Sequence, residues 1–135
     1  DARKPRFVGD MPHAWIASDY LRSAYDLFAY ERPRDQALVL AAGIPAEWLK
    51  GEGIGIRRLR TPYGQLSYRL YERDGTLELR VEQGLDVPPG GLVLPWPYAG
   101  KPAGKVVVNG TSTVWRDGEL VIRALPVTAV MATPR

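Results

Sequence analysis

The chain has 135 residues, of which 45% are hydrophobic and 24% charged, and its formal net charge is +3; this balance is typical of one globular domain with its own core. The absence of cysteine excludes a disulfide framework and thiol chemistry. Because no apolar run reaches about 18 residues and the basic residues are interspersed with acids, we expect neither a membrane nor a nucleic-acid partner.

Residues 1–33 are predicted to form an extended segment followed by one long amphipathic helix that Pro33 ends. Apolar residues recur at helical spacing over Pro12–Glu31 and fill about half of the helix circumference. Trp15 and Tyr30 fall on the opposite, polar side, so the helix has apolar surface on two sides. Since no second long helix is expected and the chain begins without an initiator methionine, we expect it to be part of a larger protein.

The remaining residues, 34–135, have the rhythm of short strands and turns. This pattern predicts a mainly β fold, an antiparallel β-sandwich of about eight strands. Alternation places two triplets of apolar residues inward: Leu66, Tyr68 and Leu70, then Leu77, Leu79 and Val81. A helical turn is expected at 44–49, and tight turns at Asp74-Gly75, Asn109-Gly110 and Asp117-Gly118. The expected strands are 37–42, 54–59, 65–72, 76–82, 92–94, 105–108, 113–115, 119–124 and 128–132.

Catalytic and metal-binding residues are not evident in the sequence. His13 is the only histidine, and no cluster of carboxylates has the spacing of a metal site. Asp74, Asp86, Asp117 and Glu119 lie in or beside turns, where aspartates usually bond their own backbone. We therefore expect no cofactor, no metal and no activity of the isolated chain.

Aromatic residues are the remaining indication of a binding role. Tryptophan and tyrosine rings can stack on sugar rings, and the Pro95-Trp96-Pro97-Tyr98 segment could present such a platform. The alternative is that the tryptophans pack in the core or between domains. We expect Trp48 and Trp115 to be largely buried, and we expect the prolines beside Trp96 to hold its ring outward.

Five short motifs follow one another in an order that resembles a known group of enzymes. These motifs are Met11-Pro12-His13-Ala14-Trp15 at the helix start, Leu38-Val39-Leu40-Ala41-Ala42-Gly43-Ile44-Pro45, Glu47-Trp48-Leu49, Thr61-Pro62-Tyr63-Gly64-Gln65-Leu66-Ser67-Tyr68, and Val107-Val108-Asn109-Gly110. Their order resembles the C-terminal end of large bacterial glycoside hydrolases with an (α/α)6 barrel, similar to the α-L-rhamnosidase-like and glycoside-phosphorylase-like groups. Some members also carry discoidin-type (coagulation factor 5/8-like) sugar-binding domains.

The resemblance implies that the last barrel helix leads into a β-sandwich that packs against the barrel. In rhamnosidase-like enzymes a histidine near the start of that helix can contact the sugar, a position that His13 would match. The candidate sugar-binding residues are thus His13, Trp15 and Trp96, whereas the catalytic carboxylates of such enzymes lie upstream. The sequence favours a structural cap for the barrel of the parent polypeptide; a carbohydrate-binding module and a protein-interaction sandwich stay open as alternatives.

Overall fold

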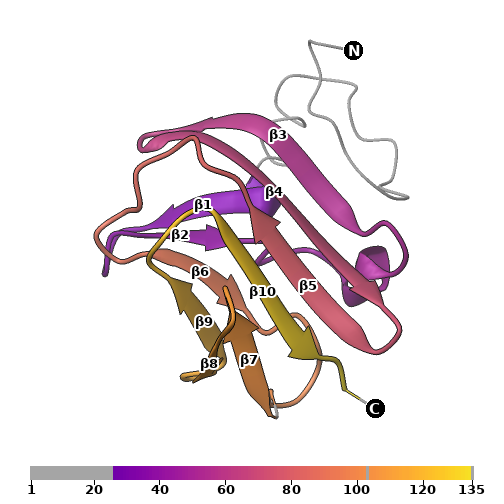
Figure 1. The fold of residues 1–135 in the computed structure, drawn as a ribbon. Helices are drawn as coiled ribbons and strands as arrows, with labels where there is room; N and C mark the ends of the chain where they lie inside the picture. Colours follow the sequence, from indigo (N-terminus) through magenta and orange to yellow (C-terminus); the bar gives the residue numbers. More distant parts are fainter. Residues whose placement is uncertain (1–25, 103, 135) are drawn as a thin grey trace.

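Two β-sheets stacked on each other form the fold in the computed structural model, which describes residues 26–102 and 104–134 (Figure 1). The four-stranded sheet has the order β1-β2-β6-β9, and its strands are β1 (Ala29–Arg32), β2 (Ala37–Leu40), β6 (Leu92–Pro95) and β9 (Glu119–Ile122). The six-stranded sheet has the order β3-β4-β5-β10-β7-β8. Its strands are β3 (Ile54–Thr61), β4 (Gly64–Arg73), β5 (Thr76–Val81), β10 (Val127–Ala132), β7 (Lys105–Val108) and β8 (Thr111–Val114). A short 3-10 helix, η1 (Ala46–Leu49), confirms the predicted helical turn.

The predicted helix to Glu31 is wrong in its last turn. Residues 26–28 are helical, but the next four residues form β1 and pair antiparallel with β2. Phe28 is fully buried, and its carbonyl oxygen accepts a 2.6 Å hydrogen bond from the Tyr68 hydroxyl. Pairing with a neighbouring strand overrides the local helical periodicity here. Among the described residues, the first strand of the sandwich therefore starts at Ala29, within residues assigned to the helix, and the part of that predicted helix before residue 26 lies outside them.

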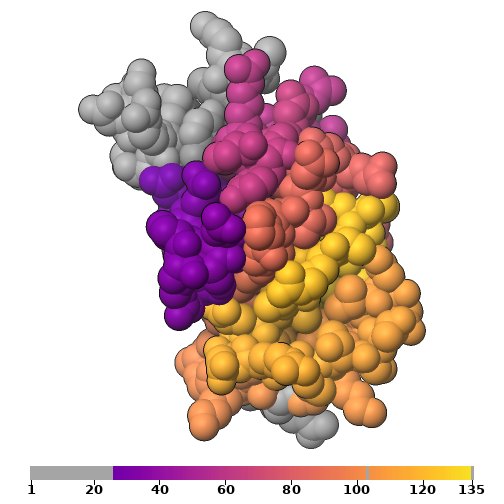
Figure 2. Space-filling model, turned by 90° about the vertical axis from the view of Figure 1, so that its left-hand side faces the viewer, coloured from indigo at the N-terminus to yellow at the C-terminus, as the bar shows by residue number. Residues whose placement is uncertain are grey.

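Sheet topology differs from the expected antiparallel sandwich at one strand pair. β2 and β6 run parallel, with Leu38 opposite Leu92 and Val39 opposite Val93. All four residues of β2 are buried, which fits the apolar run of its sequence, because parallel strands are usually covered on both faces. β10 lies between β5 and β7 in the middle of its sheet. Figure 2 shows early, middle and late parts of the chain side by side on one face, as these pairings require.

Three aspartate- or asparagine-glycine pairs form the predicted tight turns. In each, both residues have positive φ: Asp74 and Gly75, Asn109 and Gly110, Asp117 and Gly118. This conformation matches the twist of the flanking backbone in two-residue turns. The first two turns join paired strands β4–β5 and β7–β8, whereas the third lies where the chain passes from one sheet to the other.

The core fills the space between the sheets. The two triplets predicted to point inward are at most 2% exposed, and inward residues of β2, β6 and β10 complete the cluster. Burial of this kind contributes roughly 25 cal/mol per Å² of apolar surface, which makes the core the main stabilising term of the fold. Alternation leaves the opposite residues of the six-stranded sheet on its outer face.

A β-bulge interrupts β3 between Ile56 and Leu59. Arg58, inside the bulge, has φ of 57°, and its backbone N–H donates to Ser67 Oγ at 2.9 Å. The left-handed conformation costs a non-glycine residue about 1–2 kcal/mol. The bulge thus holds an arginine where glycine would fit with less strain.

The bulge can be tested by replacing Arg58 with glycine. We expect Arg58→Gly to raise the free energy of unfolding by about 0.5–1 kcal/mol, because relief of strain exceeds the added entropy of the unfolded chain. Urea denaturation measures the change. Arg57→Gly is the matched control, since Arg57 lacks the positive φ and should lose stability on substitution. Equal destabilisation by both variants would contradict the strain argument.

A second test concerns the start of the sandwich. A chain that begins at residue 34 lacks β1 and the buried Phe28 ring, and it leaves the Tyr68 hydroxyl without its acceptor. Compared with a chain that begins at residue 26, we expect it to be less stable by at least about 3 kcal/mol. Thermal unfolding of both chains measures the difference. Equal midpoints would show that β1 adds nothing to the sandwich.

Candidate functional site

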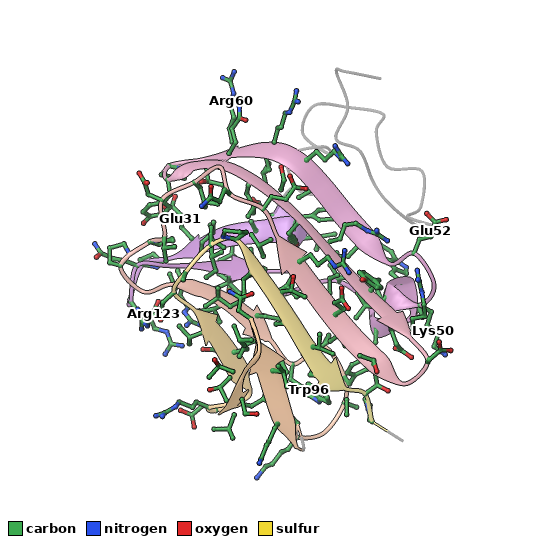
Figure 3. The ribbon with its side chains drawn as sticks, viewed as in Figure 1. Glu31, Lys50, Glu52, Arg60, Trp96 and Arg123 are labelled. Atoms are coloured by element: carbon green, nitrogen blue, oxygen red, sulfur yellow. The ribbon has the colours of Figure 1, made fainter. Side chains whose placement is uncertain are left out.

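Three aromatic rings meet at one end of the sandwich. The Trp96 ring contacts both Tyr98 and Trp115 edge to face, with centroids 5.1 Å apart in each pair. This geometry is the favoured one for aromatic rings, because the positive edge of one meets the negative face of the other. The two tryptophans, 19 positions apart in sequence, thereby form one platform; Trp96 lies toward the lower end of the view in Figure 3.

Backbone hydrogen bonds bring the two tryptophans together. Trp96 follows β6, and its N–H donates to the carbonyl of Gly118 at 2.8 Å. Arg116 and Glu119 exchange two backbone hydrogen bonds of 2.9 Å, which close the turn at Asp117-Gly118. Because Trp115 directly precedes this turn and Trp96 is bonded to it, the turn fixes both rings on the same side of the molecule.

An open hollow of about 700 Å³ lies against this platform. Ligand sites usually measure about 300–1,000 Å³ and combine apolar walls with a few polar groups. This hollow has that composition, since two indole rings face an ammonium group and two carboxylates. Its lining residues are Pro95, Trp96, Gly100, Lys101, Pro102, Trp115, Asp117, Gly118 and Glu119. A ligand with a flat apolar face and hydroxyl groups at its edge fits these groups best.

Glu119 is held in place by an arginine from β1. Arg32 Nη1 and Nη2 donate to the two Glu119 carboxylate oxygens at 2.5 and 3.1 Å, and Arg32 also binds Asp35 at 2.7 Å. Hydrogen bonds to Asp35 and then to Glu119 raise the pKa of Arg32, and the same contact lowers the pKa of Asp35. Both oxygens of Glu119 are thus engaged, which makes it a charged wall of the hollow instead of a free acid.

Tyr98 ties the platform to the six-stranded sheet. Its hydroxyl donates to Glu72 Oε1 at 2.7 Å, and Glu72 lies near the end of β4. Burial, together with the neighbouring carboxylate, raises the pKa of Tyr98, so the phenol keeps its proton throughout the neutral range. The ring that supports Trp96 is consequently anchored at both its edge and its hydroxyl.

The indole nitrogens of Trp96 and Trp115 are buried and have no hydrogen-bond partner in the part of the chain that the structure describes. A buried donor without an acceptor usually costs about 1–3 kcal/mol. Edge-to-face contact offers weak compensation, since a ring face can accept an N–H. Unsatisfied donors of this kind often mark a functional site, and here two of them belong to the same pair of rings.

Sequence-predicted site residues have different outcomes. Trp96 lies at the hollow, half-buried, whereas His13 and Trp15 lie outside the described residues. Trp48 and Trp115 are half-buried and pack against the core, but Trp115 also lines the hollow. Lys101 and Glu119 were not predicted as site residues. One sequence signal could have linked Trp96 with Trp115. Each of these tryptophans lies at the end of a strand and just before a turn or loop that contains glycine.

Comparisons with known proteins add no family: no protein-family model matches the chain, and no curated protein matches it. Among the described residues, histidine and acidic side chains form no cluster of three that could hold a metal ion. In the same part of the chain, no helix has the length and apolar character needed to cross a membrane.

The wall formed by Glu119 depends on Arg32. We expect Arg32→Met to lower the free energy of unfolding by about 1–3 kcal/mol, because it leaves a partly buried carboxylate without its donors. Urea denaturation measures the loss. Asp35→Asn is the control, since it removes only the more exposed pair and should change stability little. An equal loss in both variants would show that the contact with Glu119 is not the stabilising one.

Proposed function

We propose that this chain is a non-catalytic β-sandwich accessory domain of a carbohydrate-active protein, and that it binds a neutral sugar chain at the Trp96–Trp115 platform. The observation that carries the proposal is the meeting of two tryptophans beside an open hollow with polar walls. Tryptophan is rarely fully buried even in a core, so partial exposure alone does not separate a binding role from a structural one. What favours the binding module over the cap is that Trp96 and Trp115 both line the hollow, whereas Trp48, buried to a similar degree, does not.

Sugar chemistry fits the hollow in two ways. The apolar C–H face of a pyranose can lie on an indole ring. This contact removes apolar surface from water while the hydroxyl groups at the sugar's edge stay free to form hydrogen bonds. The ring hydroxyls then need donors and acceptors, which Lys101 and Asp117 supply at the rim of the hollow. A glycosidase would instead need two free carboxyl groups about 5–9 Å apart. Glu119 is engaged by Arg32, so hydrolysis is not proposed for this site.

The wider setting rests on the resemblance of the motifs to (α/α)6-barrel glycoside hydrolases. In that setting the catalytic acids belong to the remainder of the parent polypeptide, and the sandwich holds substrate near them. The cap for a helical barrel is the second candidate, supported by the helical periodicity of the sequence over Pro12–Glu31, of which residues 29–31 belong to β1. A protein-interaction sandwich is the third.

Tryptophan fluorescence tests the proposal directly. We expect saturable quenching of the full chain by at least one neutral oligosaccharide in a panel of plant and microbial glycans. Trp96→Ala and Trp115→Ala should each weaken binding at least tenfold, or about 1.4 kcal/mol, because each removes half of the platform. Isothermal titration calorimetry gives the affinities without depending on the deleted fluorophore.

Trp48→Phe is the matched control, because Trp48 packs against the core and does not line the hollow. It should bind the glycan as the parent chain does. A flat titration across the whole panel, with circular dichroism showing a folded protein, would remove the binding module and favour the structural cap. Loss of binding in Trp48→Phe alone would place the site elsewhere.

A further inference from the structure

Arginines gather on the outer face of the six-stranded sheet, over β3, β4 and β5. Register places Gly55 beside Arg69 and Arg69 beside Arg80, so these positions share one face, opposite the buried core residues. We call this surface the arginine face, and it comprises Arg57, Arg58, Arg60, Arg69, Arg73 and Arg80. Only Arg69 is half-buried; the others are exposed. In Figure 3 Arg60 projects at the top of the view, at the opposite end from Trp96.

Tyr71 organises the centre of the arginine face. The guanidinium carbons of Arg69 and Arg73 lie 4.8 and 5.3 Å from the centre of the Tyr71 ring. The Tyr71 hydroxyl donates to Glu78 Oε2 at 2.5 Å, and Arg80 donates to the same oxygen. Arg69 Nη2 also donates to a backbone carbonyl at 3.0 Å. These contacts orient the guanidinium groups before any ligand arrives.

The strained bulge is an independent sign that the arginine face is used. Arg58 keeps a positive φ that favours glycine, and its side chain is exposed. Strain of this kind tends to persist at functional sites, and bulges often aim a side chain. Contact between the Arg58 guanidinium group and a ligand would explain why an arginine occupies this strained position.

A smaller hollow of about 220 Å³ adds acceptors to this face. Arg57 and Arg69 line it together with Glu52 and Glu82. Arginines recognise carboxylates with paired hydrogen bonds, while carboxylates accept from hydroxyl groups. A ligand that carries both a carboxylate and hydroxyls satisfies both sets. The Tyr71 ring is flanked by two guanidinium groups, so it is poorly placed to stack a nucleic-acid base.

We propose that the arginine face binds an acidic polysaccharide, a chain of uronic-acid units, at a site separate from the Trp96–Trp115 platform. The excess of positive charge selects a polyanion, the preference for arginine selects carboxylates, and the acidic rim of the small hollow selects hydroxyl-bearing units. The choice of a glycan over another polyanion rests on the proposed function. The open sheet face suits an extended polymer.

Affinity electrophoresis and calorimetry with polygalacturonate as the probe test this site in the full chain. We expect the double variant Arg58→Gly and Arg60→Gln to weaken binding at least tenfold, while thermal unfolding stays at or above that of the parent chain. The matched control is Arg34→Gln with Arg116→Gln, which removes the same charge from exposed positions outside the face and should change the affinity less than twofold. Binding should also weaken as sodium chloride screens the charges.

Three outcomes would overturn the proposal. Equal weakening by both double variants would mean attraction to net charge alone. Tighter binding of polyglutamate or single-stranded DNA than of polygalacturonate would assign the face to another polyanion. No binding of polygalacturonate at low salt would remove the site. Trp115→Ala separates this proposal from the first, since it should weaken neutral-glycan binding at least tenfold and leave polygalacturonate binding unchanged.

Discussion

Everything in this molecule depends on one apolar layer that both sheets must share. β4, β5 and β10 each turn alternate residues into it, and β2 and β6 close it from the other side. Neither sheet could bury its inner face alone. The outer face of the six-stranded sheet and the ends of the sandwich lie outside this layer, whereas the four-stranded sheet has a second buried cluster of Ala37, Val39 and Val93. Both candidate sites lie in these places, one at an end where the chain passes between sheets and one on the outer face of the six-stranded sheet.

The two proposed binding surfaces differ in the kind of ligand group that each would contact. At the end, Trp96 and Trp115 offer apolar area, and the carboxylate that Arg32 fixes offers polarity at the rim. On the sheet face, the charged groups are arginines that contact Tyr71 and Glu78, and the proposal assigns recognition to them. Burial alone would raise the pKa of Glu78, but the Tyr71 hydroxyl and Arg80 outweigh it and lower the value, so this carboxylate stays charged in mildly acidic solution. An accessory domain with both surfaces could hold glycans that mix neutral and acidic units.

The sequence predicted those features of the fold that depend only on neighbouring residues. Alternation located the inward triplets of β4 and β5, and the three glycine turns stand where their dipeptides predict them. Pairing between strands that lie far apart in the sequence was not predicted. Nothing near Ala29 shows that it will pair with Leu40, and nothing in β2 or β6 shows that they run parallel. The same holds for the site: the prolines marked Trp96, but its contact with Trp115 depends on a turn whose backbone bonds no periodicity reveals.

Nuclear magnetic resonance of the indole N–H groups can show whether Trp96 and Trp115 bind a neutral glycan, because the chain has four tryptophans and each gives a separate signal. Titration of the ¹⁵N-labelled full chain with the neutral oligosaccharide would report which rings meet the ligand. We expect the Trp96 and Trp115 signals to shift together along one saturation curve while the Trp48 signal stays in place. Shifts confined to Trp48, or no shift of Trp96 and Trp115 at saturating glycan, would contradict it.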